Sequence, residues 1–139
     1  MRRVLDDGVD YLVCDSLAET TSAGFALDRR RDEGLGFAPD LRSRLEIALP
    51  AVVERGTRFI TNAGGFNPIA AHRAALDTAR ALGADGVRVA VVVADLPPDL
   101  GPPAGPDEIA RHVYLGAEPV VEALAAADPQ DRPRSRCWV

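Results

Sequence analysis

Lysine is absent from this chain of 139 residues, and all 16 of its basic residues are arginines. The absence excludes enzymes that form a Schiff base with a lysine and nucleotide-binding proteins that use the lysine of a P-loop. Basic residues are also outnumbered, because 21 acidic residues give a net charge of −5. This charge, and the lack of an arginine cluster on a recognisable recognition helix, indicate that nucleic acid is not a partner.

Cysteine and long apolar runs are scarce as well. Cys14 and Cys137 are the only cysteines. Two are too few for a disulfide framework and are not spaced as in a metal site, so a reduced, intracellular setting is expected. No run approaches the roughly 18 apolar residues of a membrane span, and the residues after Met1 lack the apolar core of a signal peptide. We expect a cytoplasmic protein without a membrane partner.

The pattern that is present is an alternation of short apolar runs with amphipathic segments. The apolar runs predict three strands, at 9–13, 58–62 and 87–93. The third is rich in valine, which indicates burial on both faces, as in a parallel sheet. The remaining segments predict a proline-rich loop at 95–106 and helices at about 17–31, 39–55, 67–82, 107–113 and 119–127.

This order of elements predicts an α/β fold, a small parallel sheet with flanking helices, in a single domain over residues 1–127. Residues 128–139 show no apolar period and are expected to form an irregular tail. A sheet of three parallel strands leaves both edges open. We therefore expect an incomplete domain, whose open sheet edges could pair with a second copy of the chain to form a homo-oligomer.

Local sequence also predicts where several helices begin and end. Ser16 and Glu19 have the spacing of a capping box, in which each side chain binds an N–H group of the first turn. Pro39 is expected to open the next helix, because the N–H group that proline lacks would have no partner there. Gly56 is expected to close that helix.

The segment 61–68, Thr-Asn-Ala-Gly-Gly-Phe-Asn-Pro, joins a predicted strand to a predicted helix. In an open α/β fold such a turn lies at the carboxyl end of a strand, where ligands are usually held. Gly64 and Gly65 could present N–H groups to a carboxylate, a phosphate or a thioester oxygen. They could equally form only a tight turn, with Asn67 as the N-cap. Asn62 could donate to a substrate carbonyl or hold the turn together.

Carboxylates follow two of the predicted strands. Asp15 and Glu19 are one helical turn apart and could act as a pair in proton transfer, unless Glu19 serves only the capping box. Asp95 follows the third strand and could contact a ligand at the same edge of the sheet or simply start the loop. Asp15 and Asp95 could hold a metal ion together with water ligands, but two separate carboxylates are weak evidence for a metal site, so none is predicted, and the cofactor is left unknown.

Four segments occur in an order typical of one family: 10–19 (DYLVCDSLAE), 36–40 (GFAPD), 61–68 (TNAGGFNP) and 114–117 (YLGA). Over residues 8–126 the chain thereby resembles the acyclic terpene utilisation (AtuA) family. The resemblance implies a role in the breakdown of citronellol- and geraniol-type compounds, which proceeds through coenzyme A thioesters. It therefore implies a small-molecule substrate, either an acyl-CoA or a carboxylate.

The resemblance also suggests roles for the residues at the strand ends. The glycines of the turn would supply backbone donors, its asparagines would orient the substrate, and one of the two acids after the first strand would handle a proton. The candidates for catalysis are Asp15 and Glu19, and those for substrate binding are Asn62, Gly64, Gly65, Asn67, Asp95 and Tyr114.

The chain departs from the family pattern in three places. A glycine-rich strand usually precedes the region where this chain starts, Cys14 stands where the family usually has glycine, and the segment after residue 127 lacks the expected apolar strand. We therefore expect a member of the family that is truncated at both ends. Two alternatives stay open: a non-catalytic subunit or binding module, and an inactive truncated product.

Overall fold

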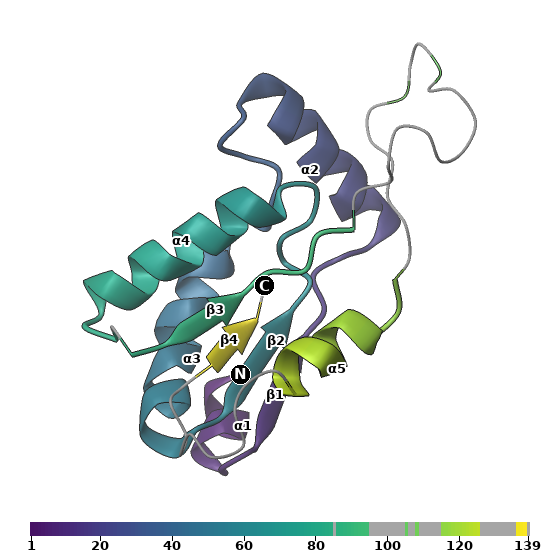
Figure 1. The fold of residues 1–139 in the computed structure, drawn as a ribbon. Helices are drawn as coiled ribbons and strands as arrows, with labels where there is room; N and C mark the ends of the chain where they lie inside the picture. Colours follow the sequence, from purple (N-terminus) through teal and green to yellow (C-terminus); the bar gives the residue numbers. More distant parts are fainter. Residues whose placement is uncertain (85, 95–104, 106–107, 109–114, 126–135, 139) are drawn as a thin grey trace.

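The computed structural model describes residues 1–84, 86–94, 105, 108, 115–125 and 136–138 (Figure 1). Its helices are α1 (Arg2–Asp6), α2 (Glu19–Arg31), α3 (Leu41–Arg55), α4 (Pro68–Ala81) and α5 (Glu118–Ala125). Its strands are β1 (Tyr11–Cys14), β2 (Arg58–Thr61), β3 (Arg88–Ala90) and β4 (Arg136–Trp138). All strand pairs are parallel, in the order β1-β2-β4-β3, which confirms the predicted α/β fold with a small parallel sheet.

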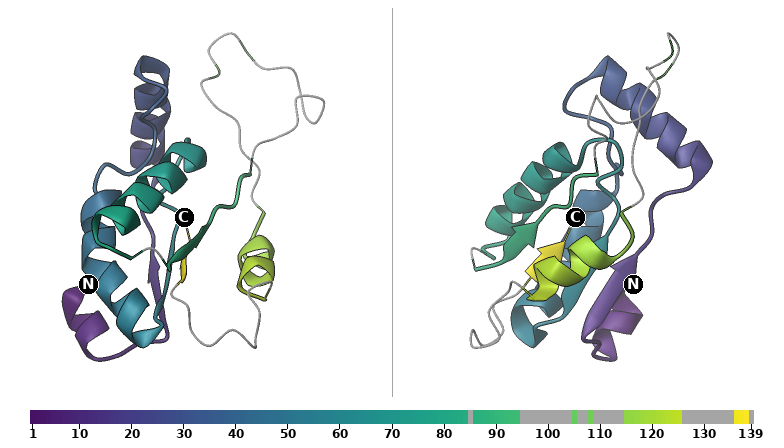
Figure 2. Two further views of the ribbon diagram at one scale, coloured as in Figure 1. Left: turned by 60° about the vertical axis from the view of Figure 1, so that its left-hand side comes forward. Right: turned by 45° about the vertical axis from the view of Figure 1, so that its right-hand side comes forward.

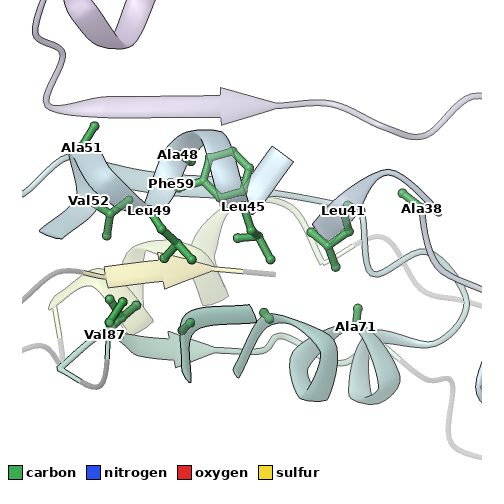
Figure 3. Close-up of a cluster of buried hydrophobic side chains, with 14 of the residues drawn as sticks. Ala38, Leu41, Leu45, Ala48, Leu49, Ala51, Val52, Phe59, Ala71 and Val87 are labelled. Atoms are coloured by element: carbon green, nitrogen blue, oxygen red, sulfur yellow. The ribbon is translucent and has the colours of Figure 1, made fainter. Parts of the chain in front are cut away.

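One face of the sheet carries the hydrophobic core. Side chains alternate along a strand, and on β2 the buried residues are Phe59 and Thr61. Phe59 is fully buried among apolar side chains of α3 and α4, both of which lie on this face (Figure 3). Leu41, Leu45, Leu49 and Val52 form the apolar stripe of α3, at the helical spacing seen in the sequence.

The opposite face of the sheet is less covered. Figure 2 shows α5 on the other side of the sheet from α3 and α4. Tyr11 and Val13, which share this face of β1, remain 50% and 67% exposed. None of the described residues of α5 is buried. The core of the described structure is therefore built almost entirely between the sheet and α3 and α4.

Several predicted helix ends are confirmed and two are wrong. Gly56 ends α3 in the left-handed conformation with φ of 75°, and Asn67 caps α4. Helix α3 begins at Leu41, two residues after the proline expected to open it. The capping box at residues 16 and 19 is wrong, because the N-cap of α2 is Ala18, two residues after Ser16. Its first turn is closed instead by Thr21, whose Oγ1 accepts from the N–H of Ala18 at 2.8 Å.

The C-terminal segment departs from the prediction. An irregular tail is expected there, but Arg136–Trp138 form β4 and pair in parallel with β2 and with β3. The expectation was wrong for these three residues because their order comes from backbone pairing with two distant strands, which leaves no periodic pattern in the sequence. The short helix expected at 107–113 and most of the loop at 95–106 lie outside the described residues.

None of the described helices has the length and apolar character needed to cross a bilayer.

Candidate functional site

The candidate site lies where β1 and β2 end. Cys14 and Thr61 are register partners at the carboxyl ends of these parallel strands, so the next residues, Asp15 and Asn62, emerge side by side. Asn62 Nδ2 donates to Asp15 Oδ1 at 2.6 Å, and the N–H of Ser16 donates to Asn62 Oδ1 at 2.7 Å. Both ends of the Asn62 amide are thus used to fasten the two strand ends together.

Asp15 is an exposed carboxylate whose hydrogen bonds favour its charged form. Besides Asn62, the N–H of Leu17 donates to the same oxygen, Oδ1, at 3.0 Å. These donors, with Asn62 contributing most, lower the pKa of Asp15 from its ordinary value of 3.8, and the small loss of hydration opposes them only in part. At neutral pH Asp15 is therefore an anion suited to accept hydrogen bonds, and it is poorly suited to donate a proton.

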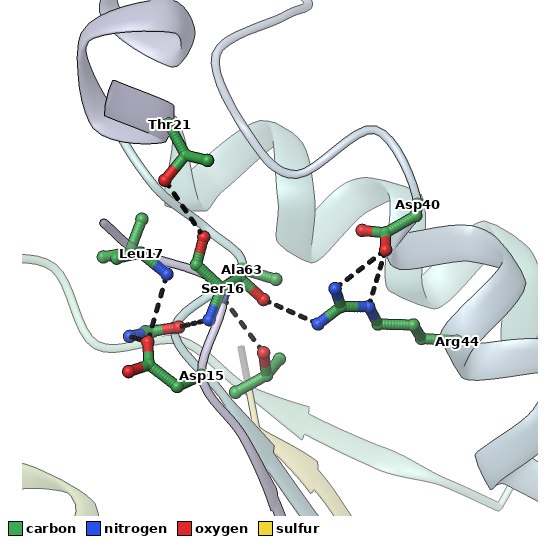
Figure 4. A network of polar contacts seen from close by, with 9 residues as sticks. Asp15, Ser16, Leu17, Thr21, Asp40, Arg44 and Ala63 are labelled. Atoms are coloured by element: carbon green, nitrogen blue, oxygen red, sulfur yellow. Dashed lines mark hydrogen bonds and ion pairs between the residues drawn. The ribbon is translucent and has the colours of Figure 1, made fainter. Parts of the chain in front are cut away.

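Asp15 and Asn62, at the ends of β1 and β2, belong to what we call the rim. A second layer of contacts, from α3, supports it (Figure 4). Arg44 Nη1 donates to Ser16 Oγ at 2.8 Å. Its Nε and Nη2 both lie 2.8 Å from Asp40 Oδ2, one helical turn earlier. Thr21 Oγ1, at the start of α2, lies 3.4 Å from the carbonyl oxygen of Ser16. Ser16 is thereby fixed between two helices and the end of β2.

Arg44 was missed by sequence reasoning. Its spacing from Asp40 predicts a pair on one helix face, and the structure contains that pair. Its bond to Ser16 joins positions 28 residues apart. Such a contact follows only once the helix has been docked on the sheet, so no local pattern could have found it.

The glycine turn after β2 uses most of its N–H groups internally. The N–H of Gly65 donates to the carbonyl of Asn62 at 3.2 Å, and that of Asn67 to the carbonyl of Gly64 at 2.9 Å. The N–H of Phe66 donates across to the carbonyl of Gly36 at 2.9 Å. Gly64 is buried, and its own N–H has no acceptor among the described residues. Of the two predicted glycine donors, Gly64 is therefore the one whose N–H has no acceptor in the described structure.

Gly65 has a steric reason to be glycine. Its φ is 51°, in the left-handed region, and a Cβ there would lie 2.8 Å from Cδ2 of Phe25 and 3.0 Å from the carbonyl oxygen of Gly36. A side chain would therefore be strained in its backbone and blocked by its neighbours. This position holds the turn against α2 and the loop that follows it.

Asn67 is committed to the fold. Its side chain is buried, Nδ2 donates to the carbonyl oxygens of Glu33 and Leu35 at 2.7 Å each, and Oδ1 accepts from the N–H of Ala70 at 3.2 Å. These contacts cap α4 and tie it to the loop before α3. With these bonds in place, Asn67 has little capacity left to orient a substrate.

Of the remaining candidates, the structure describes Glu19 alone. Glu19 is exposed as the first residue of α2, and no hydrogen bond or ion pair links it to Asp15 in the described part of the chain. Asp95 and Tyr114 lie outside the described residues. Within the residues that the structure describes, no three His, Cys, Asp or Glu side chains are grouped closely enough to hold a metal ion.

Comparison with known proteins gives a match to a protein family. The family model described as "Acyclic terpene utilisation family protein AtuA" matches residues 1–128, which include the whole rim between β1 and β2. No curated protein and no solved structure matches the chain significantly.

Proposed function

The chain belongs to the acyclic terpene utilisation family, and we propose that it acts in acyclic terpenoid catabolism by binding an acyl-coenzyme A thioester at the rim of Asp15, Asn62 and Gly64. The family description supports the terpenoid class of compound. The observation that carries the choice of site is the 2.6 Å hydrogen bond from Asn62 to Asp15, which pre-positions a charged acceptor at the carboxyl ends of two parallel strands. The cytoplasmic setting expected from the sequence is part of the same proposal.

The charge of Asp15 favours a thioester over a free carboxylate. Two like charges about 4 Å apart repel by roughly 1 kcal/mol in water and about 4 kcal/mol near a protein surface. A free terpenoid acid would place its carboxylate against an aspartate whose pKa is already lowered. A thioester carbonyl is neutral, so the same repulsion does not arise.

The hydrogen-bond donor of the rim, the Gly64 N–H, and its acceptor, the Asp15 carboxylate, suit two polar parts of an acyl-CoA: the thioester carbonyl and the amides of the pantetheine arm. The carbonyl oxygen accepts hydrogen bonds, and the N–H of Gly64 has no other acceptor among the described residues. The amide N–H groups of the pantetheine arm donate hydrogen bonds, for which Asp15 is the matching acceptor. In this arrangement Asn62 acts through Asp15, as a positioning residue, rather than by direct contact with the substrate.

Proton transfer is the weaker part of the predicted role. A carboxylate with a lowered pKa is a poor general base and a still poorer general acid near neutral pH. We therefore assign Asp15 to binding, and catalysis by Glu19 stays a prediction.

Isothermal titration calorimetry tests the proposal. The ligands are a geraniol-derived acyl-CoA, the corresponding free acid and coenzyme A alone. We expect the thioester to bind more tightly than the free acid, and Asp15→Asn to weaken thioester binding by about tenfold, equal to the loss of one charged hydrogen bond.

The matched control is Asp77→Asn, which removes an exposed carboxylate on α4 that pairs with Arg80. It should bind the thioester as the unchanged protein does. Absence of heat above that of buffer at millimolar thioester would refute the binding proposal. Tighter binding of the free acid than of the thioester would refute the argument from charge.

A further inference from the structure

Strand β1 forms one edge of the sheet. The order β1-β2-β4-β3 gives it a single neighbour among the described strands, β2. The N–H of Arg58 donates to the carbonyl of Asp10 at 2.8 Å, so the backbone groups of Asp10 point toward β2. Backbone groups alternate in direction along a strand, and those of Leu12 therefore also point toward β2. Those of Tyr11 and Val13 point the other way.

This outer edge is unpaired and apolar in the described part of the chain. No described residue makes a backbone hydrogen bond to the outward groups of Tyr11 or Val13. Their side chains are 50% and 67% exposed, and Arg58 stacks over the Tyr11 ring at 5.2 Å from its centroid. Natural edge strands usually carry lysine, proline, a charged residue or a bulge that prevents pairing. The four residues of β1 contain none of these.

We propose that β1 pairs with β1 of a second copy of this chain, antiparallel and about a two-fold axis through Leu12. In this register Tyr11 lies opposite Val13 of the partner subunit, and Val13 lies opposite Tyr11 of the partner subunit. Both members of each pair have outward-facing backbone groups, so each pair exchanges two N–H···O bonds and the dimer gains four. On the open face of the sheet, each pair sets an aromatic ring beside a β-branched side chain, a favourable cross-strand combination.

The extent of β1 favours this register over its neighbours. An axis through Tyr11 or Val13 would pair that residue with itself and set the other outward-facing residue opposite position 9 or 15, outside the strand. Such a register would therefore form fewer backbone hydrogen bonds within β1 than an axis through Leu12 does. An axis through Leu12 sets the carboxylates of residues 10 and 15 opposite uncharged positions of the partner, Cys14 and Val9.

The strand that we propose to pair with the outer edge of β1 is β1 of a second copy of this chain. Antiparallel pairing of two identical edges gives a two-fold dimer, the commonest symmetry of soluble dimers, and lets each outward residue of β1 exchange both of its backbone hydrogen bonds with one residue of the partner. The pairing joins two sheets into one without covering α3 or α4. It does not depend on the proposed thioester site.

Light scattering coupled to size-exclusion chromatography, over a range of protein concentrations, tests the proposal. We expect the mass to rise to that of a dimer, and Val13→Lys to return it to that of a monomer, because a charged residue then faces the partner's Tyr11. The matched control is Val121→Lys on α5, where valine is 59% exposed. It should leave the dimer intact. Circular dichroism establishes that both variants are folded.

Oxidative cross-linking tests the register itself, in a background of Cys14→Ser and Cys137→Ser. Leu12→Cys should form a disulfide-linked dimer, because residues on the axis form a pair with Cα atoms about 4.5 Å apart. Val13→Cys alone should not, because its counterpart is Tyr11. A monomeric mass at every concentration, a dimer that survives Val13→Lys, or cross-linking of Val13→Cys instead of Leu12→Cys would each overturn the proposal.

Discussion

Two asparagines, five positions apart on the same turn, are used in opposite ways. Asn62 is exposed and joins two other exposed groups, the carboxylate of Asp15 and the N–H of Ser16. Asn67 is buried and joins the carbonyls of Glu33 and Leu35 to the first turn of α4. Each amide has both its oxygen and its nitrogen occupied, so the use of the two amide groups does not distinguish them.

The difference lies in whether the group bound by each asparagine stays exposed, where a ligand could reach it. The two carbonyls that Asn67 binds belong to the loop before α3, and their bonds connect that loop to α4. The partner that Asn62 binds, Asp15, remains exposed and charged, with its pKa lowered by that very bond. A buried amide of this kind stabilises the fold, whereas the exposed one orients a group that can meet a ligand.

The largest expected effect comes from Asn67→Ala. The substitution leaves two carbonyls and one helix N–H without their partner and removes the cap of α4. We expect the free energy of unfolding to fall by about 3 kcal/mol. Urea denaturation followed by circular dichroism measures it. A loss no greater than that of Asn62→Ala would contradict the distinction between the two asparagines.

Gly65→Ala should have the next largest effect. It forces an alanine into a left-handed conformation, and its Cβ would lie 2.8 Å from the ring of Phe25. We expect a loss of about 2 kcal/mol in the free energy of unfolding. Gly24→Ala is the matched control, because a Cβ at this helical position has open space. It should raise stability by about 0.5 kcal/mol. Equal effects of the two substitutions would show that the turn is not sterically confined.

Asn62→Ala should change stability by less than about 1 kcal/mol, because its partners are exposed to water. Its clearer effect is electrostatic: the pKa of the Asp15 carboxyl should rise toward its ordinary value once its main hydrogen-bond donor is gone. Carbon-detected NMR titration of the Asp15 carboxyl measures the shift. An unchanged pKa in the variant would remove the positioning role proposed for Asn62.

The smallest expected effect is the pH dependence contributed by Asp15. The pKa of this group is lower in the folded chain than in the unfolded one. Its contribution to stability is therefore present above the unfolded pKa and is lost as the pH falls through the folded pKa. Unfolding of the parent and of Asp15→Asn should differ most at neutral pH and converge in strong acid. A gap that widens toward acid would contradict the assigned direction of the pKa.

Much of this rim could be predicted from the sequence, because it depends on adjacent strands. Once 9–13 and 58–62 are taken as parallel neighbours, Asp15 and Asn62 must emerge at one edge, and their hydrogen bond confirms that placement. The cap at Asn67 is likewise local, since it precedes Pro68 and an amphipathic run. Their functional roles stay predictions.

What could not be predicted depends on contacts between distant segments. Ser16 was expected to cap α2, but its hydroxyl accepts from Arg44, an interaction that exists only after α3 packs on the sheet. The strand β4 is stabilised by neighbours that lie far away in the sequence. The hydrogen bonds of the glycine turn could not be predicted either, because the N–H of Phe66 donates to the carbonyl of Gly36, thirty residues earlier.

The contact of Phe25 and Gly36 with the turn has a consequence for α2. This helix makes no extensive contact with any other described helix or strand. It is attached through Phe25, through the bond from Arg29 to the carbonyl of Phe66, and through Thr21 beside Ser16. All three attachments lie at or next to the candidate rim. Amide hydrogen exchange along the thirteen residues of α2 would therefore report the arrival of a ligand that touches none of them.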